Sequence, residues 1–170
     1  MGKNTQLQHQ QVSKQIKKFP ISILANDIEI AGNIGNLFRI ADAFGIQKIY
    51  LTGTSAVPPK YKIRKAARST EKKVSFAQSS SAIEVVKQLK SLNTKIISLE
   101  ITSQSQDLRS FKMSNQQPIC VIIGSEKTGI SQQLLDLSDH TLHIPMYGEN
   151  SSMNVANCCA IALYELIRFY

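Results

Sequence analysis

The sequence predicts a single α/β domain built around a mainly parallel β-sheet. Its 170 residues are enough for one domain with a hydrophobic core. Short apolar runs alternate along the chain with segments of helical periodicity, a pattern typical of helices that cross between parallel strands. Pro118–Ile123 is apolar at successive positions, as expected of a strand buried on both faces of such a sheet.

Each predicted element follows from a local pattern. Short apolar runs bounded by turn residues predict strands, at Ile21–Ala25, Ile46–Thr52, Val74–Ala77, Lys95–Ile101, Pro118–Ile123 and Thr141–Ile144. Apolar side chains that recur every three or four residues predict helices, at Asn33–Phe44, Ser81–Leu92, Ile130–Leu137 and Val155–Tyr170. Gly45 is expected to end the first helix. Thr102–Gln117 is polar and irregular, with one helical turn expected at Asp107–Phe111.

Positive charge is concentrated in two parts of the chain. The 20 Lys and Arg against 12 Asp and Glu give a net charge of +8, which favours a polyanionic partner. Residues 1–18 are basic and offer little to bury, so we expect a flexible arm that precedes a single domain of residues 19–170. Lys60–Lys73, the basic segment, is denser in cations. A solvated face is the alternative, but we favour contact with nucleic acid, through Lys60, Lys62, Arg64, Lys65 and Arg68.

Several classes of protein are disfavoured. No apolar run approaches the ~20 residues of a membrane span, and residues 1–18 lack the hydrophobic segment of a secretory signal. Cys120, Cys158 and Cys159 fall in predicted core elements, which suggests reduced, buried thiols in a cytoplasmic protein. His140 and His143 are three apart on a predicted strand and should point to opposite faces, so no metal site is expected.

Three polar loops are predicted at strand ends, where ligands bind in open α/β sheets. They are Asn33–Arg39, Gly124–Gly129 and Tyr147–Asn154, and the last runs into the long apolar C-terminal helix. The chain has no G-x-x-x-x-G-K-[ST] phosphate loop and no G-x-S-x-G nucleophile elbow. These absences argue against a generic nucleotide-binding protein and against a serine hydrolase.

Taken in order, the three loops resemble motifs of the SPOUT superfamily of methyltransferases, in its SpoU (TrmH-like) branch. The first motif is Asn33-Ile34-Gly35-Asn36-Leu37-Phe38-Arg39 with Phe44-Gly45. The second is Ile123-Gly124-Ser125-Glu126-Lys127-Thr128-Gly129-Ile130. The third is Ile144-Pro145-Met146 followed by Ser152-Met153-Asn154. All three motifs are complete, and the resemblance covers about Ile21 to Glu165.

The resemblance implies a C-terminal trefoil knot, a homodimer, and methyl transfer from S-adenosylmethionine to a ribose 2′-hydroxyl of tRNA or rRNA. A non-catalytic RNA-binding module that retains the knotted fold is the alternative function. The cofactor would be cradled by the backbone around Leu99, Gly124, Ile144 and Met153, with Ser152 nearby. The active-site positions implied by the family are Asn33, Arg39, Glu126, Ser152 and Asn154.

Each active-site position also has a purely structural interpretation. Asn33 and Ser152 are residue types that cap helices, Glu126 can complement a helix dipole, and Asn154 can hold its loop by bonding backbone groups. Arg39 has buried neighbours, so its guanidinium requires a carboxylate or, as we favour, a phosphate. Whether Arg39 takes the hydroxyl proton or only orients phosphate and ribose stays open, because guanidinium keeps its proton far above neutral pH.

Overall fold

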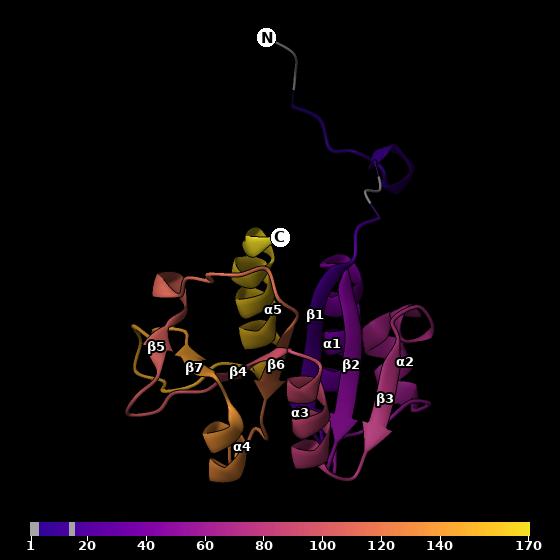
Figure 1. The fold of residues 1–170 in the computed structure, drawn as a ribbon. Coiled ribbons are helices and arrows are strands. Elements are labelled where there is room, and N and C mark those ends of the chain that lie inside the picture. The colour runs from indigo at the N-terminus through magenta and orange to yellow at the C-terminus, as the bar shows by residue number, and fades with distance from the viewer. Residues whose placement is uncertain (1–3, 14–15) are drawn as a thin grey trace.

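A parallel sheet forms the centre of the computed structural model, which describes residues 4–13 and 16–170 (Figure 1). Within those residues, seven strands lie in the order β3-β2-β1-β6-β4-β7-β5, and every paired neighbour is parallel. The strands are β1 (Phe19–Asn26), β2 (Ile46–Thr52), β3 (Phe76–Ser79), β4 (Lys95–Leu99), β5 (Gln106–Asp107), β6 (Ile119–Ile123) and β7 (His140–His143). The predicted α/β class with a parallel sheet is confirmed.

Helices cover both faces of this sheet. The α-helices are α1 (Ala31–Ala43), α2 (Tyr61–Ala67), α3 (Ala82–Ser91), α4 (Gln132–Leu137) and α5 (Val155–Leu166). The short 3₁₀ turns are η1 (His9–Gln11), η2 (Thr70–Lys72), η3 (Leu108–Ser110) and η4 (Ile167–Phe169). Side chains of α1, α2 and α5 share one core cluster, and those of α3 and α4 share another. Each cluster includes strand residues, so the sheet is packed on both sides.

Strand β6 explains why the two cores are separate. All five of its residues are buried. Ile119, Val121 and Ile123 point into the core beneath α1 and α5, whereas Cys120 and Ile122 point into the core beneath α3 and α4. This alternation is the period-two geometry of a strand, and it confirms the prediction of a strand buried on both faces.

Several predicted boundaries were wrong: β4 ends at Leu99, α4 begins at Gln132, and α5 ends at Leu166. Two other differences have a clear local cause. Helix α1 begins at Ala31, with Ile30 as its N-cap, so Asn33 lies in the first turn and does not cap the helix. Strand β3 begins at Phe76, two residues later than predicted. The apolar character of Val74 predicts a strand residue, but its N–H donates to the carbonyl of Thr70 and its side chain is buried in the core.

The basic segment also contains an unpredicted helix, α2, because its many charges obscure a short apolar face. Ile63 and Ala67 form that face and are buried. They pack on α1 where it carries Gly35: a Cβ on Gly35 would lie 2.6 Å from the carbonyl oxygen of Ile63. The glycine of the first motif therefore permits close contact between α1 and α2.

Residues 4–13 extend away from the sheet (Figure 1), and their described side chains are exposed. Residues 1–3 and 14–15 of the expected arm, including Lys3 and Lys14, lie outside the described residues. Lys17 donates to the carbonyl oxygen of Tyr170 and Lys18 to that of Ile46, each at 3.2 Å.

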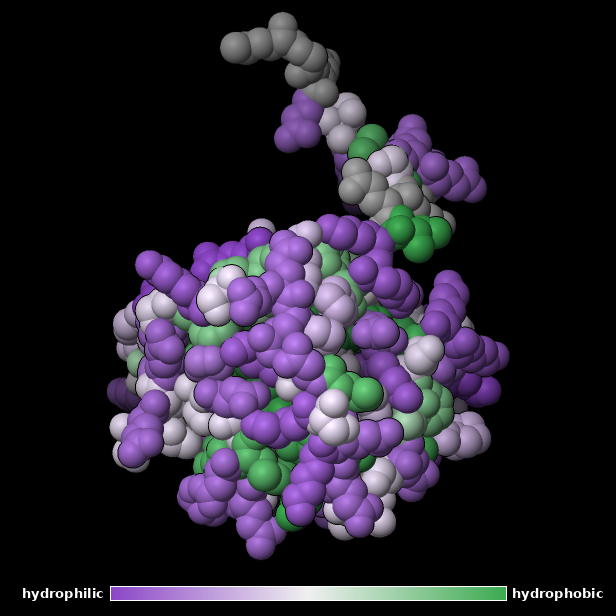
Figure 2. All heavy atoms as spheres, viewed as in Figure 1, coloured by the Kyte–Doolittle hydropathy of each residue, from purple (hydrophilic) through white to green (hydrophobic). Residues whose placement is uncertain are grey.

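The surface in view in Figure 2 is covered mainly by hydrophilic residues, with smaller separate apolar patches. In the described part of the chain, no helix combines the length and apolarity needed to cross a bilayer.

Candidate functional site

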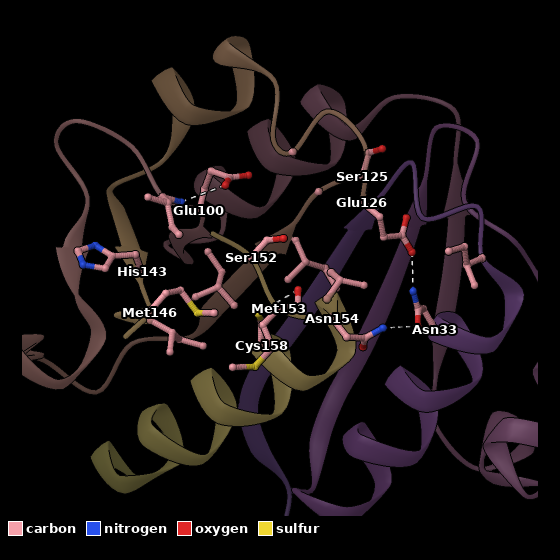
Figure 3. A pocket seen from close by; sticks show the side chains of 18 residues that line it. Asn33, Glu100, Ser125, Glu126, His143, Met146, Ser152, Met153, Asn154 and Cys158 are labelled. Carbon is pink, nitrogen blue, oxygen red and sulfur yellow. Dashed lines mark hydrogen bonds between the residues drawn. The ribbon is translucent and has the colours of Figure 1, made fainter. Parts of the chain in front are cut away.

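A cavity of about 490 Å³ lies at the carboxyl ends of β4, β6 and β7 (Figure 3). Its walls come from all three motif segments and from the residues that follow β4. The five residues predicted to hold the cofactor all line it, namely Leu99, Gly124, Ile144, Ser152 and Met153. Four of the five predicted catalytic residues line it, because Asn33, Glu126 and Asn154 join Ser152 there. The fold therefore brings together residues that are up to 121 positions apart in the chain.

A chain of side-chain hydrogen bonds joins the three motifs (Figure 3). Asn154 Nδ2 donates to Asn33 Oδ1 at 3.1 Å, and Asn33 Nδ2 donates to Glu126 Oε1 at 2.5 Å. Asn33 is 6% exposed, so its amide is held in one orientation by partners on both sides. The contact also places the Glu126 carboxylate beside the first turn of α1. Its bonding partner is therefore on α1 and not on α4, the helix that follows Glu126 in the sequence.

Asn154 has a second bonding role at the start of α5. It is the N-cap of that helix, and its Oδ1 accepts hydrogen bonds from the N–H groups of Ala156 and Asn157. Asn154 thus bonds backbone groups, as its structural interpretation expects, and these groups belong to the first turn of α5. Ser152 is not the cap of α5; it lines the cavity with an exposed side chain.

Close backbone packing shapes the cavity wall at Gly124. A Cβ on this residue would lie 2.4 Å from the carbonyl carbon and oxygen of Gly129, so only glycine fits there without displacing backbone. Gly129 has a φ of +67°, a conformation that suits glycine, and its N–H closes the turn by donating to Ser125 O at 2.9 Å. These two glycines give the second motif its compact shape.

Glu100 was not singled out from the sequence, although it directly follows β4 and lines the cavity. Its Oε1 accepts a hydrogen bond from the N–H of Ile101, and its Oε2 accepts one from the N–H of Ile130, both at 3.0 Å. It thus connects the end of β4 to the loop of the second motif. The available signal was a lone acid at the carboxyl end of an apolar strand.

The cavity is acidic although the protein is basic. Among the described residues, those that line it include Glu100 and Glu126 but neither lysine nor arginine. Cys158 also lines it. Burial raises the pKa of the Cys158 thiol, and the negative charge of Glu100 adds to this effect. The expectation that all three cysteines are in the core was therefore wrong for Cys158, which α5 presents to the cavity. Cys120 and Cys159 are fully buried.

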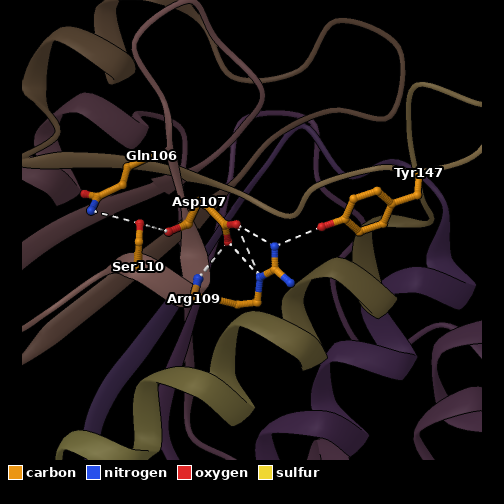
Figure 4. Close-up of polar contacts among 5 residues, drawn as sticks. All are labelled: Gln106, Asp107, Arg109, Ser110 and Tyr147. Atoms are coloured by element: carbon orange, nitrogen blue, oxygen red, sulfur yellow. Dashed lines mark hydrogen bonds and ion pairs between the residues drawn. The ribbon is translucent and has the colours of Figure 1, made fainter.

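A polar cluster beside the cavity ties two loops together (Figure 4). Arg109 donates from Nε and Nη2 to the carboxylate of Asp107, and Nη2 also donates to the hydroxyl of Tyr147 at 2.9 Å. Hydrogen bonding from Arg109 lowers the pKa of Asp107. Tyr147 directly follows Met146, which lines the cavity. The cluster therefore links the segment after β5 to the residue that follows Met146, and nothing in the sequence pattern indicated this contact.

Arg39 does not line this cavity. It lies six residues after Asn33 on α1, about 9 Å along the helix axis, and its side chain is exposed. None of the ion pairs found among the described residues involves it. The five predicted RNA-binding residues of the basic segment, Lys60, Lys62, Arg64, Lys65 and Arg68, are exposed as well.

No cluster of three or more His, Cys, Asp or Glu suited to a metal ion occurs in residues 4–13 and 16–170. His143 is engaged with a hydroxyl instead, with its Nδ1 3.0 Å from Ser105 Oγ.

Comparison with known proteins gives the same family as the motifs. A sequence model of the SpoU rRNA methylase family matches residues 20–164. The chain is 28% identical over 151 residues to the tRNA (guanosine(18)-2′-O)-methyltransferase of Escherichia coli, covering 87% of this chain and 63% of that protein. It is 33% identical over 141 residues to the 23S rRNA (uridine(2479)-2′-O)-methyltransferase of Streptomyces viridochromogenes, covering 81% of this chain and 48% of that protein.

Solved structures share the fold. The TrmH/SpoU tRNA modifying enzyme of A. aeolicus aligns with a TM-score of 0.79 and 23% identity, covering 90% of this chain and 76% of that one. The SpoU methyltransferase AviRb from Streptomyces viridochromogenes, in complex with the cofactor AdoMet, aligns with a TM-score of 0.79 and 24% identity. The alignment covers 95% of this chain and 64% of that one. At these identities the likeness establishes the fold alone.

The chain spans 63% and 48% of the two curated relatives above. Because the family model matches nearly the whole domain and its motifs meet at one cavity, the chain belongs to the SpoU rRNA methylase family.

Proposed function

We propose that this protein transfers a methyl group from S-adenosylmethionine to a ribose 2′-hydroxyl of tRNA or rRNA. The observation that carries the proposal is the meeting of the three family motifs at one cavity, joined by the hydrogen bonds from Asn154 to Asn33 and from Asn33 to Glu126. The relatives named as tRNA and rRNA 2′-O-methyltransferases support the reaction and the substrate class.

The cavity residues fit this cofactor. The bound cofactor supplies a methyl group on a positively charged sulfonium, which is already reactive. The cavity combines apolar walls at Leu99, Ile144 and Met153 with the carboxylates of Glu100 and Glu126. Among the described residues, no lysine or arginine lines it. A low positive charge density in the wall favours a cationic ligand, because like charges would repel it.

The protein's contribution to the reaction is mainly alignment. Asn33 and Asn154 orient each other, and Asn33 also holds the Glu126 carboxylate at the cavity wall. Ser152, on the same wall, is available to bond the ribose or the cofactor. Holding hydroxyl oxygen, methyl carbon and sulfur in line can supply much of the rate enhancement. Arg39, exposed on α1, is suited to hold an RNA phosphate through its planar guanidinium.

RNA binding is assigned to positively charged surfaces outside the cavity. The exposed cations of α2 and its flanks form one such surface, with Lys60, Lys62, Arg64, Lys65 and Arg68. The arm of residues 1–18 is proposed as a second. Both would contact the RNA backbone without reading its sequence.

We further propose that the chain is knotted, with α5 threaded through the loop that links β4 to β6. Contacts between that loop and the C-terminus support the threading. Arg168 donates to the carbonyl oxygen of Phe111, Gln116 to that of Phe169, and Tyr170 to that of Gln117. In Figure 1 this loop crosses the end of α5. A crystal structure with unbroken density from residue 99 to residue 170 would test the threading.

A homodimer is the proposed assembly. Its support is an exposed apolar surface on α5, where Tyr164 is 66% and Ile161 39% exposed. The Tyr164 ring lies next to that of Phe44, the C-cap of α1. A second copy of this chain could cover that surface. Light scattering on the purified protein tests this, and a Tyr164→Glu variant should then be monomeric.

The reaction is tested by incubating the protein with methyl-labelled S-adenosylmethionine and total RNA, followed by alkaline hydrolysis. Label in alkali-resistant dinucleotides locates the methyl group on a 2′-oxygen. Label on single nucleotides would place it on a base and contradict the proposal. RNA binding without cofactor binding in calorimetry would instead favour the non-catalytic RNA-binding module.

A further inference from the structure

Glu100 is a carboxylate inside the cavity that none of the three motifs contains. It is held from both sides, because Oε1 accepts from the N–H of Ile101 and Oε2 from the N–H of Ile130. It also packs directly on Gly129, where a Cβ would lie 2.5 Å from Oε2. Both carboxylate oxygens are therefore bonded in an arrangement that holds the charge at the cavity wall.

The charge of Glu100 is not neutralised by a cation of the cavity wall. The salt bridges found among the described residues join Lys90 to Asp139, Arg109 to Asp107 and Arg168 to Glu165, and none involves Glu100. Backbone N–H groups supply its two hydrogen bonds. The charge also acts across the cavity, since it adds to burial in raising the pKa of the Cys158 thiol on α5.

Figure 3 shows Glu100 and Glu126 on different sides of the cavity. Glu126 is engaged by the amide of Asn33, which belongs to the first motif. Glu100 lies between the end of β4 and the second motif, next to Gly129. The two acids can therefore have different roles, and Glu100 has no partner among the proposed catalytic residues.

We propose that Glu100 is a specificity residue that makes the cavity prefer positively charged S-adenosylmethionine over the neutral thioether product, S-adenosylhomocysteine. This inference rests on the proposed function. Methyl transfer breaks the sulfur–carbon bond and leaves the electron pair on sulfur, while the methyl carbon bonds to the ribose oxygen and the hydroxyl proton passes to a base, either water or Arg39. The ligand in the cavity thus loses one positive charge, and the attraction to Glu100 weakens at that moment. Because the product is attracted to Glu100 less strongly than the cofactor is, methyl transfer itself promotes product release.

A purely structural role for Glu100 predicts a different pattern. If Glu100 only connects β4 to the second motif, its removal should lower the affinities for S-adenosylmethionine and S-adenosylhomocysteine by the same factor. Glu100→Gln keeps the size of the side chain but removes the charge and one of the two acceptors. Glu100→Asp keeps the charge but shortens the reach to Ile130. The ratio of the two affinities, and not either affinity alone, therefore separates charge from positioning.

The test is titration calorimetry of the full-length protein with S-adenosylmethionine, S-adenosylhomocysteine and sinefungin, in which an amine-bearing carbon replaces the sulfonium. In Glu100→Gln we expect the preference for S-adenosylmethionine over S-adenosylhomocysteine to fall by about tenfold. The affinity for sinefungin should fall by the same factor as the affinity for S-adenosylmethionine. Glu100→Asp should keep the wild-type preference. Glu84→Gln on α3, which removes an exposed carboxylate that does not line the cavity, is the matched control and should also keep it.

Salt dependence of the wild-type protein provides a second measurement that needs no variant. Raising the ionic strength should lower the affinity for S-adenosylmethionine more than the affinity for S-adenosylhomocysteine, because only S-adenosylmethionine carries the extra charge. Equal losses for both ligands in Glu100→Gln, or equal salt dependence in the wild type, would overturn the inference and leave the proposed function intact. A wild-type protein that binds neither ligand would overturn the proposed function itself.

Discussion

At the scale of single residues, the site depends on backbone contacts that leave no room for a side chain. Gly124 is the sharpest case, because the space that a Cβ would fill is occupied by the carbonyl of Gly129. Replacing Gly124 with Val should push the second motif apart and lower the affinity for S-adenosylmethionine by ~10-fold or more. Calorimetry checks this. Gly148→Val is the matched control, since nothing lies within 4 Å of its Cβ position. Equal affinity for both variants would remove Gly124 from the site.

Arg39 provides the second test at this scale. Arg39→Lys keeps the positive charge but loses the planar fork that holds phosphate bidentately. If Arg39 positions phosphate and ribose, turnover should fall ~100-fold while the pH profile keeps its shape. Cofactor affinity should be unchanged, because Arg39 does not line the cavity. Near-normal turnover with a pH profile displaced to lower pH would instead identify Arg39 as the base, since lysine releases its proton more readily.

At the scale of elements, Asp139 joins α3, β4 and β7. Its Oδ2 accepts a hydrogen bond from the N–H of Ile96 at 2.7 Å, and its Oδ1 pairs with Lys90 Nζ at 2.7 Å. Burial alone would raise the pKa of Asp139, but the bonds from Ile96 and Lys90 outweigh it, so the pKa is lowered. A lowered pKa stabilises the fold above the unfolded value of about 4, and this contribution is lost as pH falls through the folded pKa.

Asp139→Asn should therefore destabilise the protein at pH 7 by about 1 kcal/mol, a modest figure because the pair is partly exposed. Urea unfolding at pH 7 and pH 3 measures the effect, and the difference between wild type and variant should shrink at pH 3. Asp136→Asn on α4 is the control, because Asp136 is exposed and takes part in none of the ion pairs found in the described residues. A destabilisation that is the same at both pH values would contradict the assigned role.

At the scale of the whole molecule, charge is divided between an acidic cavity and basic outer surfaces. Replacing Arg64, Lys65 and Arg68 together with Ala should weaken RNA binding and lower the slope of log affinity against log salt by roughly 2 to 3. Cofactor affinity should not change, because none of the three lines the cavity. Lys87→Ala on α3, which packs on the opposite face of the sheet from α2, serves as control. An unchanged salt slope would show that the basic segment is a solvated face that does not contact RNA.

The sequence by itself determined the class of fold, most of its elements and the family. Apolar periodicity is a local property, so it was enough to predict β1, β2, β4, β6 and α3 to within a few residues. The three motifs are contiguous stretches of chain, so they too were visible without a structure. Element boundaries were less certain where a buried residue served a turn, as Val74 does, or where charge hid a short buried face, as in α2.

Only the tertiary structure decided which side chains meet. Asn33, Glu126 and Asn154 come from three separate motifs, and their hydrogen bonds exist because β6, α1 and α5 bring them to one end of the sheet. Glu100 and the Asp107–Arg109–Tyr147 cluster belong to no motif, and they acquire a role only through neighbours distant in the chain. Local patterns follow from the preferences of each residue, whereas a binding cavity is made by contacts between segments that sequence spacing does not encode.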